Sequence, residues 1–369
     1  MRILIAPDKF KGSLKAAEAA TAIRDGFSRV FPHANFELIP IADGGEGTAT
    51  LFLDSMQGEE VRSPAHDALG RAISATYGWF SKTKTAVIEM SEASGLWRLH
   101  PSEHDPLQTT TFGTGELIRD ARERGARKIL VALGGSATND AGVGMAEALG
   151  WKFLDASENE MAPRVGNFSK IQRLIPPPPS GQCEITALCD VVNPLLGPLG
   201  ATHVYSVQKG ATPAMIQNLE MGLTHLADLC HQQLHGDHRN VPGAGAAGGL
   251  GFGLLTFCDA QIEPGFQAVS KMLGLSQKII SADLIITGEG RIDTQSEHGK
   301  GPVEVARLAR THGKPVIAFA GCIAGSTSAF DACIPIADGP ISREDSEQRA
   351  AELLCDAAER SARLLSISL

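Results

Sequence analysis

The sequence has 369 residues and a net charge of −9, with 43% hydrophobic and 20% charged residues. This composition is that of an ordinary globular protein, and the length favours two domains. The negative net charge argues against nucleic acid and anionic membranes as partners. The seven cysteines show no paired spacing, which favours reduced thiols and a cytoplasmic protein. The sequence has no apolar run of about 18 residues, the length needed to span a membrane.

Short β-branched apolar runs alternate with stretches of helical periodicity, which predicts an α/β fold with a mainly parallel sheet. The expected strands are 2–6, 35–41, 85–90, 128–133, 184–188, 203–206, 284–287, 315–320 and 332–336. The expected helices are 15–30, 47–53, 114–123, 143–149, 213–234, 302–311 and 346–365. Strands near both ends are expected to share one sheet. Residues 1–66 and 277–369 would then form one discontinuous domain, with 67–276 inserted into it.

Acid- and glycine-rich loops follow several of these strands. In chain order they are APDKFKGS (6–13), ADGGEGT (42–48), SEASG (91–95), GGSATND (134–140), CDVVNP (189–194) and TGEGRID (287–293). Ligands of open parallel sheets bind at the carboxyl ends of the strands, so the loops predict one shared cleft. The alternative is that Asp and Gly merely punctuate strand ends, as they do in most proteins.

The first loop sets Asp8, Lys9 and Lys11 just beyond a buried strand. Two lysines suit an anionic substrate, while Ser13 is expected to be the N-cap of the following helix. The second loop adds two candidate binding acids, Asp43 and Glu46.

The loop at 134–140 joins an expected strand to an expected helix but lacks the lysine of a Walker loop. Backbone amides of Gly134, Gly135 and Ser136 at a helix start are able to hold an anion. The same loop adds three further candidates, which are Thr138, Asn139 and Asp140. The alternative is structural, with Thr138 or Asn139 capping the helix.

Asp190 ends the run EITALCD and is a candidate general base for an alcohol or a metal ligand. The alternative is a turn acid ahead of Asn-Pro. Its neighbour Cys189 has no visible partner and is interpreted as a buried cysteine. The run GAGAAGG (243–249) matches a dinucleotide fingerprint, but it does not follow a strand. A flexible or phosphate-facing loop is therefore favoured over NAD binding.

The segment TGEGRID and its continuation suit a magnesium–phosphate site. Its candidate residues are Gly288, Glu289, Gly290, Arg291, Asp293 and Lys300. Carboxylates hold the metal there, and cations neutralise the charge on a transferring phosphoryl group. The alternative is a solvated loop with internal ion pairs.

Together these motifs resemble the bacterial glycerate kinases of the type-1 family. The matching segments are APDKFKGSL, ADGGEGT, GGSATNDAGVGM, ALCDVVNPLLGPLGA, QKGA, GAGAAGGLG and ADLIITGEGRID. They span nearly the whole chain in one order. The resemblance implies a Rossmann-like domain with a mainly parallel sheet, a second α/β domain inserted in it, and an active site in the cleft between them. Lys209 of QKGA joins the expected binding residues.

The resemblance further implies phosphorylation of D-glycerate by ATP with Mg²⁺, with 2-phosphoglycerate favoured over 3-phosphoglycerate. Asp190 is then expected to act on the substrate hydroxyl, Lys11 and Arg291 to complete the catalytic set, and Glu289 and Asp293 to hold the metal. A kinase of another small hydroxy acid and a non-catalytic sugar-acid-binding protein are the alternatives. The expected partners are small molecules only, and a homodimer is left open.

Overall fold

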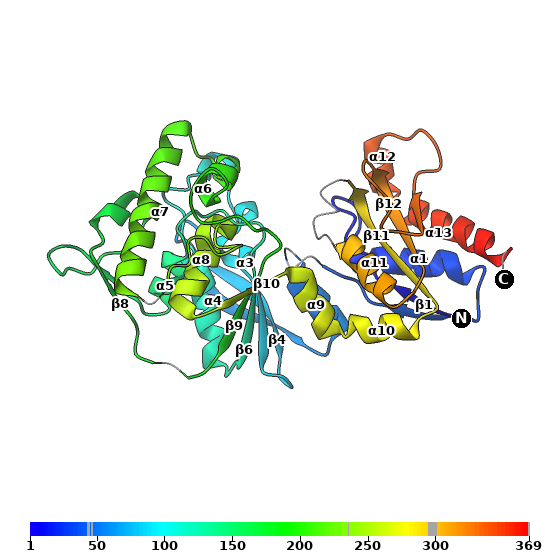
Figure 1. The fold of residues 1–369 in the computed structure, drawn as a ribbon, viewed down its shortest axis with the longest axis horizontal. Coiled ribbons are helices and arrows are strands. Elements are labelled where there is room, and N and C mark those ends of the chain that lie inside the picture. The colour runs from blue at the N-terminus through cyan, green and yellow to red at the C-terminus, as the bar shows by residue number, and fades with distance from the viewer. Residues whose placement is uncertain (43–44, 46, 180, 235, 294–300, 368–369) are drawn as a thin grey trace. The chain divides into compact units, whose positions relative to one another are not determined.

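The computed structural model describes residues 1–42, 45, 47–179, 181–234, 236–293 and 301–367 (Figure 1). The chain divides into a first unit, Met1–Asp43 with Gly265–Leu369, and a second unit, Gly44–Pro264. The sequence analysis placed these boundaries after residues 66 and 276. Strand β3 (Glu59–His66) pairs within the second unit's sheet, and helix α9 (Gly265–Leu273) belongs to the first unit.

The first unit contains a five-stranded, all-parallel sheet in the order β13-β12-β11-β1-β2. Its strands are β1 (Arg2–Ile5), β2 (Asn35–Leu38), β11 (Leu284–Ile292), β12 (Val316–Ile323) and β13 (Ala332–Pro335). β1 pairs with β11 in a register that sets Ile3 opposite Leu284. The first strand of the chain therefore lies beside a strand from its last third.

Six helices of the described ranges accompany this sheet. They are α1 (Ala16–Ser28), α9 (Gly265–Leu273), α10 (Leu275–Ser281), α11 (Gly301–Thr311), α12 (Arg343–Gln348) and α13 (Ala350–Ser366). One face of α1 is apolar and faces the core, since Ala19, Ala20, Ile23 and Phe27 are buried. α1 packs closely on α13 at Gly26, where a Cβ atom would meet the Cys355 carbonyl oxygen at 2.3 Å.

The second unit contains a six-stranded sheet in the order β10-β9-β6-β5-β4-β3. Its strands are β3 (Glu59–His66), β4 (Ala72–Phe80), β5 (Thr85–Glu89), β6 (Lys128–Ala132), β9 (Glu184–Leu188) and β10 (Gln261–Glu263). β5, β6, β9 and β10 are parallel, whereas β3 and β4 form an antiparallel hairpin at one side. The expected α/β class is confirmed. A separate small sheet pairs β7 (Lys152–Leu154) with β8 (Arg173–Ile175).

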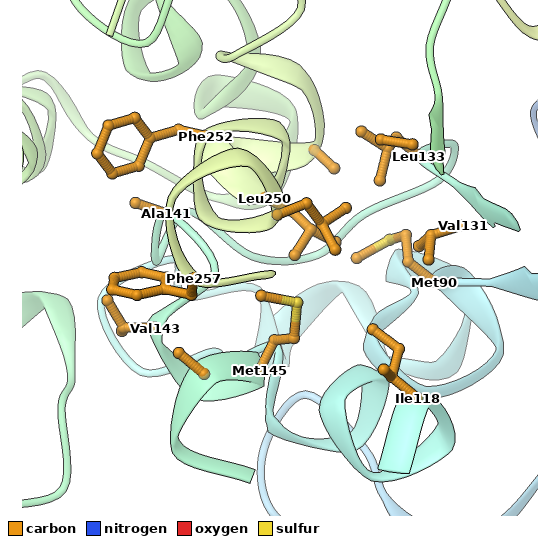
Figure 2. Packing of buried hydrophobic residues seen from close by; sticks show 14 of the residues in the cluster. Met90, Ile118, Val131, Leu133, Ala141, Val143, Met145, Leu250, Phe252 and Phe257 are labelled. Atoms are coloured by element: carbon orange, nitrogen blue, oxygen red, sulfur yellow. The ribbon is translucent and has the colours of Figure 1, made fainter. Parts of the chain in front are cut away.

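Helices cover the second sheet. They are α2 (Thr48–Ser55), α3 (Ser91–Ser94), α4 (Phe112–Glu123), α5 (Val143–Ala148), α6 (Ala201–Tyr205), α7 (Pro213–Gln233) and α8 (Ala246–Cys258), with four short 3₁₀ turns at Leu96–Arg98, Pro101–Glu103, Val165–Lys170 and Val207–Lys209. Figure 2 shows Leu250 of α8, Met145 of α5 and Val131 of β6 within one buried cluster. This core is built from α8 as much as from the sheet.

The strand expected at 203–206 is wrong, because this segment lies in α6. The β-branched and aromatic residues favour a strand locally, but Gly200 opens a helical turn, in which its carbonyl accepts the amide of Val204 at 3.1 Å. Within the described ranges, no helix is long and apolar enough to cross a membrane.

Candidate active site

Three polar loops follow neighbouring parallel strands of the second unit. Residues 91–95 follow β5, residues 134–142 follow β6, and residues 189–193 follow β9. Because β5, β6 and β9 are adjacent and parallel, their carboxyl ends share one edge of the sheet. The expected loop at 6–13 lies instead at the sheet of the first unit. Most of the other expected loop, 287–293, is wrong as a loop, because strand β11 of that sheet continues to Ile292 and pairs with β12.

The loops after β5 and β6 are joined by backbone hydrogen bonds. The amide of Leu96 donates to the carbonyl of Gly135 at 2.8 Å, and the amide of Ala137 donates to the carbonyl of Ser94 at 2.9 Å. Gly135 is exposed and has a φ of +72°, which suits glycine. The loop after β6 thus presents its glycines at the surface while its following residues turn inward.

Asp140 anchors the inner half of this loop. Its carboxylate accepts the Thr111 amide at 2.8 Å, the Thr111 hydroxyl at 2.9 Å and the Gly142 amide at 3.1 Å. Burial raises the pKa of the Asp140 carboxyl, while these hydrogen bonds act against the rise. Asp140 therefore holds the loop to the start of α4. The sequence reasoning missed Thr111, and the run of three threonines before that helix was the available signal.

Lys209 enters the same loop from the QKGA turn. It is 2% exposed, and its ammonium group donates to the Ser136 hydroxyl at 2.8 Å and to the Thr138 carbonyl at 2.7 Å. Burial lowers the pKa of Lys209 to about 7, and the negative charge of Asp140 opposes this effect. A loop without the lysine of a Walker motif thus receives an amino group from a distant segment.

Two polar atoms in the loop have no partner among the described residues. They are the Thr138 hydroxyl oxygen and the Asn139 side-chain carbonyl oxygen, both buried. The side-chain amide of Asn139 donates to the Thr202 hydroxyl at 3.3 Å. Buried polar atoms left without partners are uncommon, and a bound ligand, ion or water is one way in which such atoms are satisfied.

The glycine-rich segment that resembles a dinucleotide fingerprint packs against this loop. The amide of Ala141 donates to the carbonyl of Gly248 at 3.0 Å, and a Cβ atom on Gly248 would meet the Thr138 carbonyl oxygen at 1.9 Å. Ala247, Gly248 and Gly249 all have positive φ values. The glycines therefore serve a close approach of two backbone segments, which supports the rejection of the fingerprint.

Asp190 lies at the carboxyl end of β9 with its side chain exposed. The loop beyond it is held by Asn193, which donates to the Leu199 carbonyl at 2.7 Å and accepts the Tyr205 hydroxyl at 2.7 Å. Burial raises the pKa of the adjacent Cys189 thiol to about 11, so this cysteine stays protonated. Asp190 is thus an acid that this edge presents to solvent.

Glu89 is a further acid at this edge that the sequence reasoning missed. It ends β5, is 7% exposed, and accepts the amides of Gly47 at 3.0 Å and Ala49 at 2.8 Å at the start of α2. It therefore anchors the end of the ADGGEGT motif. Two candidates of that motif, Asp43 and Glu46, lie outside the described residues.

In the first unit, the structure brings the loop after β1 beside β11. The amide of Asp8 donates to the carbonyl of Gly288 at 2.8 Å, and a Cβ atom on Gly290 would lie 3.0 Å from the Lys11 amide nitrogen. Glycine at 290 allows this approach. Asp8 is buried, Lys9 is half-buried and Lys11 is exposed. The expected N-cap at Ser13 is wrong, because its hydroxyl donates to the Phe10 carbonyl at 3.0 Å and Lys15 occupies the N-cap position of α1.

The acids and the guanidinium of β11 lie in one short stretch. Glu289 is 7% exposed. Burial and, to a smaller extent, the negative charge of Glu289 raise the pKa of the Cys333 thiol to about 11. Arg291 forms an ion pair with Asp293 at 3.0 Å while its side chain stays 65% exposed. The remaining candidate of this segment, Lys300, lies outside the described residues.

These carboxylates are of the kind that can hold a magnesium ion when other ligands complete its coordination. The described part of the chain contains no cluster of three or more His, Cys, Asp or Glu side chains able to hold a metal by itself. Mg²⁺ in phosphoryl-transfer sites needs only one or two carboxylates, because phosphate oxygens and water complete its octahedron. Glu289 and Asp293 supply donors of that kind.

Comparison with known proteins shows to which family the chain is similar. Residues 3–366 match the model of the glycerate kinase family. The chain is 42% identical to "Glycerate kinase" of Bacillus subtilis (strain 168), covering 100% of this chain and 98% of the relative. It is 41% identical to "Glycerate 2-kinase" of Escherichia coli (strain K12), covering 100% and 99%. A crystal structure described as "putative glycerate kinase 2 from Salmonella typhimurium LT2" matches with a TM-score of 0.90 at 42% identity, covering 100% of this chain and 99% of that one.

Proposed function

The chain belongs to the glycerate kinase family and is a kinase that phosphorylates glycerate, and from this premise we propose that ATP is its phosphoryl donor and D-glycerate its acceptor. We favour transfer to the 2-hydroxyl, which gives 2-phosphoglycerate. The name of the relative from Escherichia coli supports that product. We also propose that the two compact units are two domains, the second inserted in the first.

The observation that carries the proposal is the set of polar loops at the shared edge of β5, β6 and β9. Such an edge offers hydroxyls, amides and one exposed carboxylate to a small polar acid. We assign Asp190 to the glycerate hydroxyl, as base or as orienting group. The remaining binding candidates on this unit are Gly134, Gly135, Ser136, Thr138 and Asn139, while the buried Asp140 and Lys209 hold the loop that carries them.

The first unit supplies cations and carboxylates. Lys11 and the exposed guanidinium of Arg291 would neutralise charge on the phosphate oxygens, with Asp8 and Lys9 beside them. Glu289 and Asp293 would hold Mg²⁺ or its water ligands. Bound magnesium would withdraw charge from the phosphates and hold them in line. Phosphoryl transfer of this kind depends on positioning more than on proton abstraction, so the fixed backbone of both loop sets suits it.

An ADP-release assay tests the proposal. The purified protein is given ATP with D-glycerate, L-glycerate, lactate or glycolate, with and without magnesium, and the product is analysed by ³¹P NMR. We expect magnesium-dependent ADP release that is fastest with D-glycerate, and a phosphate on C2. No ADP above background with D-glycerate would contradict the proposal. Faster turnover with another hydroxy acid would favour the alternative substrate class.

A further inference from the structure

The Ser136 hydroxyl has an unusual hydrogen-bond environment in the loop after β6. Its oxygen accepts the Lys209 ammonium at 2.8 Å and the Thr138 amide at 3.4 Å, so both acceptor positions are taken. Its own proton has one partner in the loop, the Thr138 carbonyl at 3.3 Å. Strong O–H···O hydrogen bonds are about 2.5–3.0 Å long, so this proton is weakly engaged.

Lys209 enforces this polarity. An ammonium group has three donors and no acceptor, so Ser136 must accept from it and keep its own proton for another oxygen. The Thr138 carbonyl already accepts Lys209 at 2.7 Å, which makes it a poor competitor for that proton. An anionic oxygen placed near the loop would be a better acceptor, because hydrogen bonds to charged oxygens are shorter and stronger.

The position of the hydroxyl permits such a contact. Ser136 is 7% exposed. Of the two residues before it, Gly134 is half-buried and Gly135 is exposed, so the surface of the loop begins directly beside Ser136. Lys209, at 2% exposed, is shielded from the same surface. A ligand would therefore contact the serine without contacting the lysine.

We propose that Lys209 is a positioning residue that presets the Ser136 hydroxyl as a hydrogen-bond donor to an anionic oxygen of the bound substrate, without touching the substrate itself. This inference rests on the proposed function. The anionic oxygen belongs either to the glycerate carboxylate or to an ATP phosphate, which share the same chemistry. Asp140 and Thr111 hold the backbone of the loop separately, and Lys209 adds one backbone contact at the Thr138 carbonyl, which its coupling to Ser136 must be distinguished from.

A double-mutant cycle tests this coupling. Steady-state constants for D-glycerate and for ATP are measured at pH 6.5 for the natural protein, Ser136→Ala, Lys209→Met and the double variant. Each single change is expected to raise the KM of the same one substrate about tenfold, the worth of one charge-assisted hydrogen bond. The KM of the double variant should not exceed the higher of the two single-variant values, because Lys209 acts through the Ser136 hydroxyl, which Ser136→Ala has already removed. The substrate whose KM changes identifies the oxygen.

A matched cycle separates this effect from general loosening of the loop. Thr202→Val removes the partner of the Asn139 amide without touching Ser136. Its effect should multiply with that of Ser136→Ala. The proposal would be overturned if the effects of Lys209→Met and Ser136→Ala on KM multiplied in the double variant. It would equally be overturned if Thr202→Val and Ser136→Ala failed to multiply to the same extent as Lys209→Met and Ser136→Ala.

The proposal stays testable if Lys209→Met does not fold. Lys209→Gln, which is shorter and neutral, then takes its place in the cycle, with circular dichroism confirming the native fold. Ser136→Ala is decisive alone, since unchanged KM values for both substrates would overturn the inference whatever happens at Lys209. Absence of glycerate-dependent ADP release by the natural protein would instead contradict the proposed function, before any variant is compared.

Discussion

The amide of Asp8 donates a 2.8 Å hydrogen bond to the carbonyl of Gly288, across the boundary of β1 and β11. Two motifs that lie at opposite ends of the sequence are therefore neighbours at the carboxyl edge of one sheet. Lys11 reaches this edge from one motif, and Glu289 reaches it from the other. The pairing supports a shared role in binding magnesium and phosphate.

Replacement of Lys11 by alanine is expected to raise the KM of D-glycerate or of ATP several-fold. The glycerate carboxylate and the triphosphate both need positive charge nearby, which a protein of negative net charge must supply through specifically placed cations. Lys9→Ala should have the smaller effect. Steady-state kinetics measures both, with Lys82→Ala, an exposed lysine bonded to Gln57, as the control. If Lys11→Ala keeps both constants, Lys11 is only a surface residue.

Asp190→Asn is expected to lower kcat about a hundredfold and to leave the KM of ATP nearly unchanged, because a positioned base or orienting group acts on the acceptor alone. Glu184→Gln is the matched control, since Glu184 is an exposed acid at the opposite end of the same strand β9. Single-turnover kinetics at saturating ATP measures the loss. An effect on magnesium dependence alone would contradict the assigned role.

Asp293→Asn is expected to raise the magnesium concentration needed for half-maximal activity, because one of the proposed carboxylate ligands is lost. Glu289→Gln should act in the same direction. Titration of activity with MgCl₂ at fixed ATP measures the shift. A loss of turnover that saturating magnesium does not restore, with the same half-maximal concentration, would show that Asp293 serves the chemical step instead.

Gly248→Ala is expected to destabilise the protein by more than about 3 kcal/mol, because its Cβ atom would meet the Thr138 carbonyl oxygen at 1.9 Å. Gly274→Ala is the matched control. It has a similar φ of +63° with nothing within 4 Å of the added atom, so it should cost only about 1 kcal/mol of backbone strain. Thermal unfolding measures both, and equal losses would show that backbone strain alone accounts for them.

The buried Lys209 predicts a pH dependence of stability. Its pKa is about 7 in the folded protein against an ordinary 10.5, so between these values the unfolded chain binds a proton that the folded chain gives up. The contribution of Lys209 to stability should therefore rise with pH across this window and be smallest below about pH 7. Urea midpoints at pH 7, 8 and 9 measure this contribution. From each pH to the next, the midpoint of the natural protein should rise relative to that of Lys209→Met. Parallel curves would contradict the shifted pKa.

Most parallel strands of both sheets were predictable because each is a short apolar run bounded by polar or glycine residues. The parallel strand β10 was missed, since Gln261–Glu263 has a single apolar residue. The expected strand at 184–188 coincides with β9, and that at 128–133 differs from β6 by one residue. The β3–β4 hairpin was missed. β3 buries Val61, Ser63 and Ala65 in alternation, but the small and polar members of this series weaken the apolar signal.

The loops of the candidate site were predictable from the sequence, but the directions in which their side chains point were not. Glycines and hydroxyls at 134–140 predicted a ligand loop, while the sequence does not show that Asp140 turns inward. That direction depends on Thr111, which arrives from the start of α4. The contact between Lys209 and Ser136 likewise joins residues 73 positions apart, which no local pattern encodes.

The pairing of β1 with β11 also governs the order in which the chain can fold. Residues 44–264 are contiguous and bury their own core, so they can complete their structure while the ribosome is still adding residues. β1 leaves the ribosome before the second unit but gains its β11 neighbour only after Leu284–Ile292 have been made. Until then β1 has an unpaired edge, which is prone to misassociation. The slow, vulnerable step in biogenesis is therefore expected in the part of the protein that carries the chain's two ends.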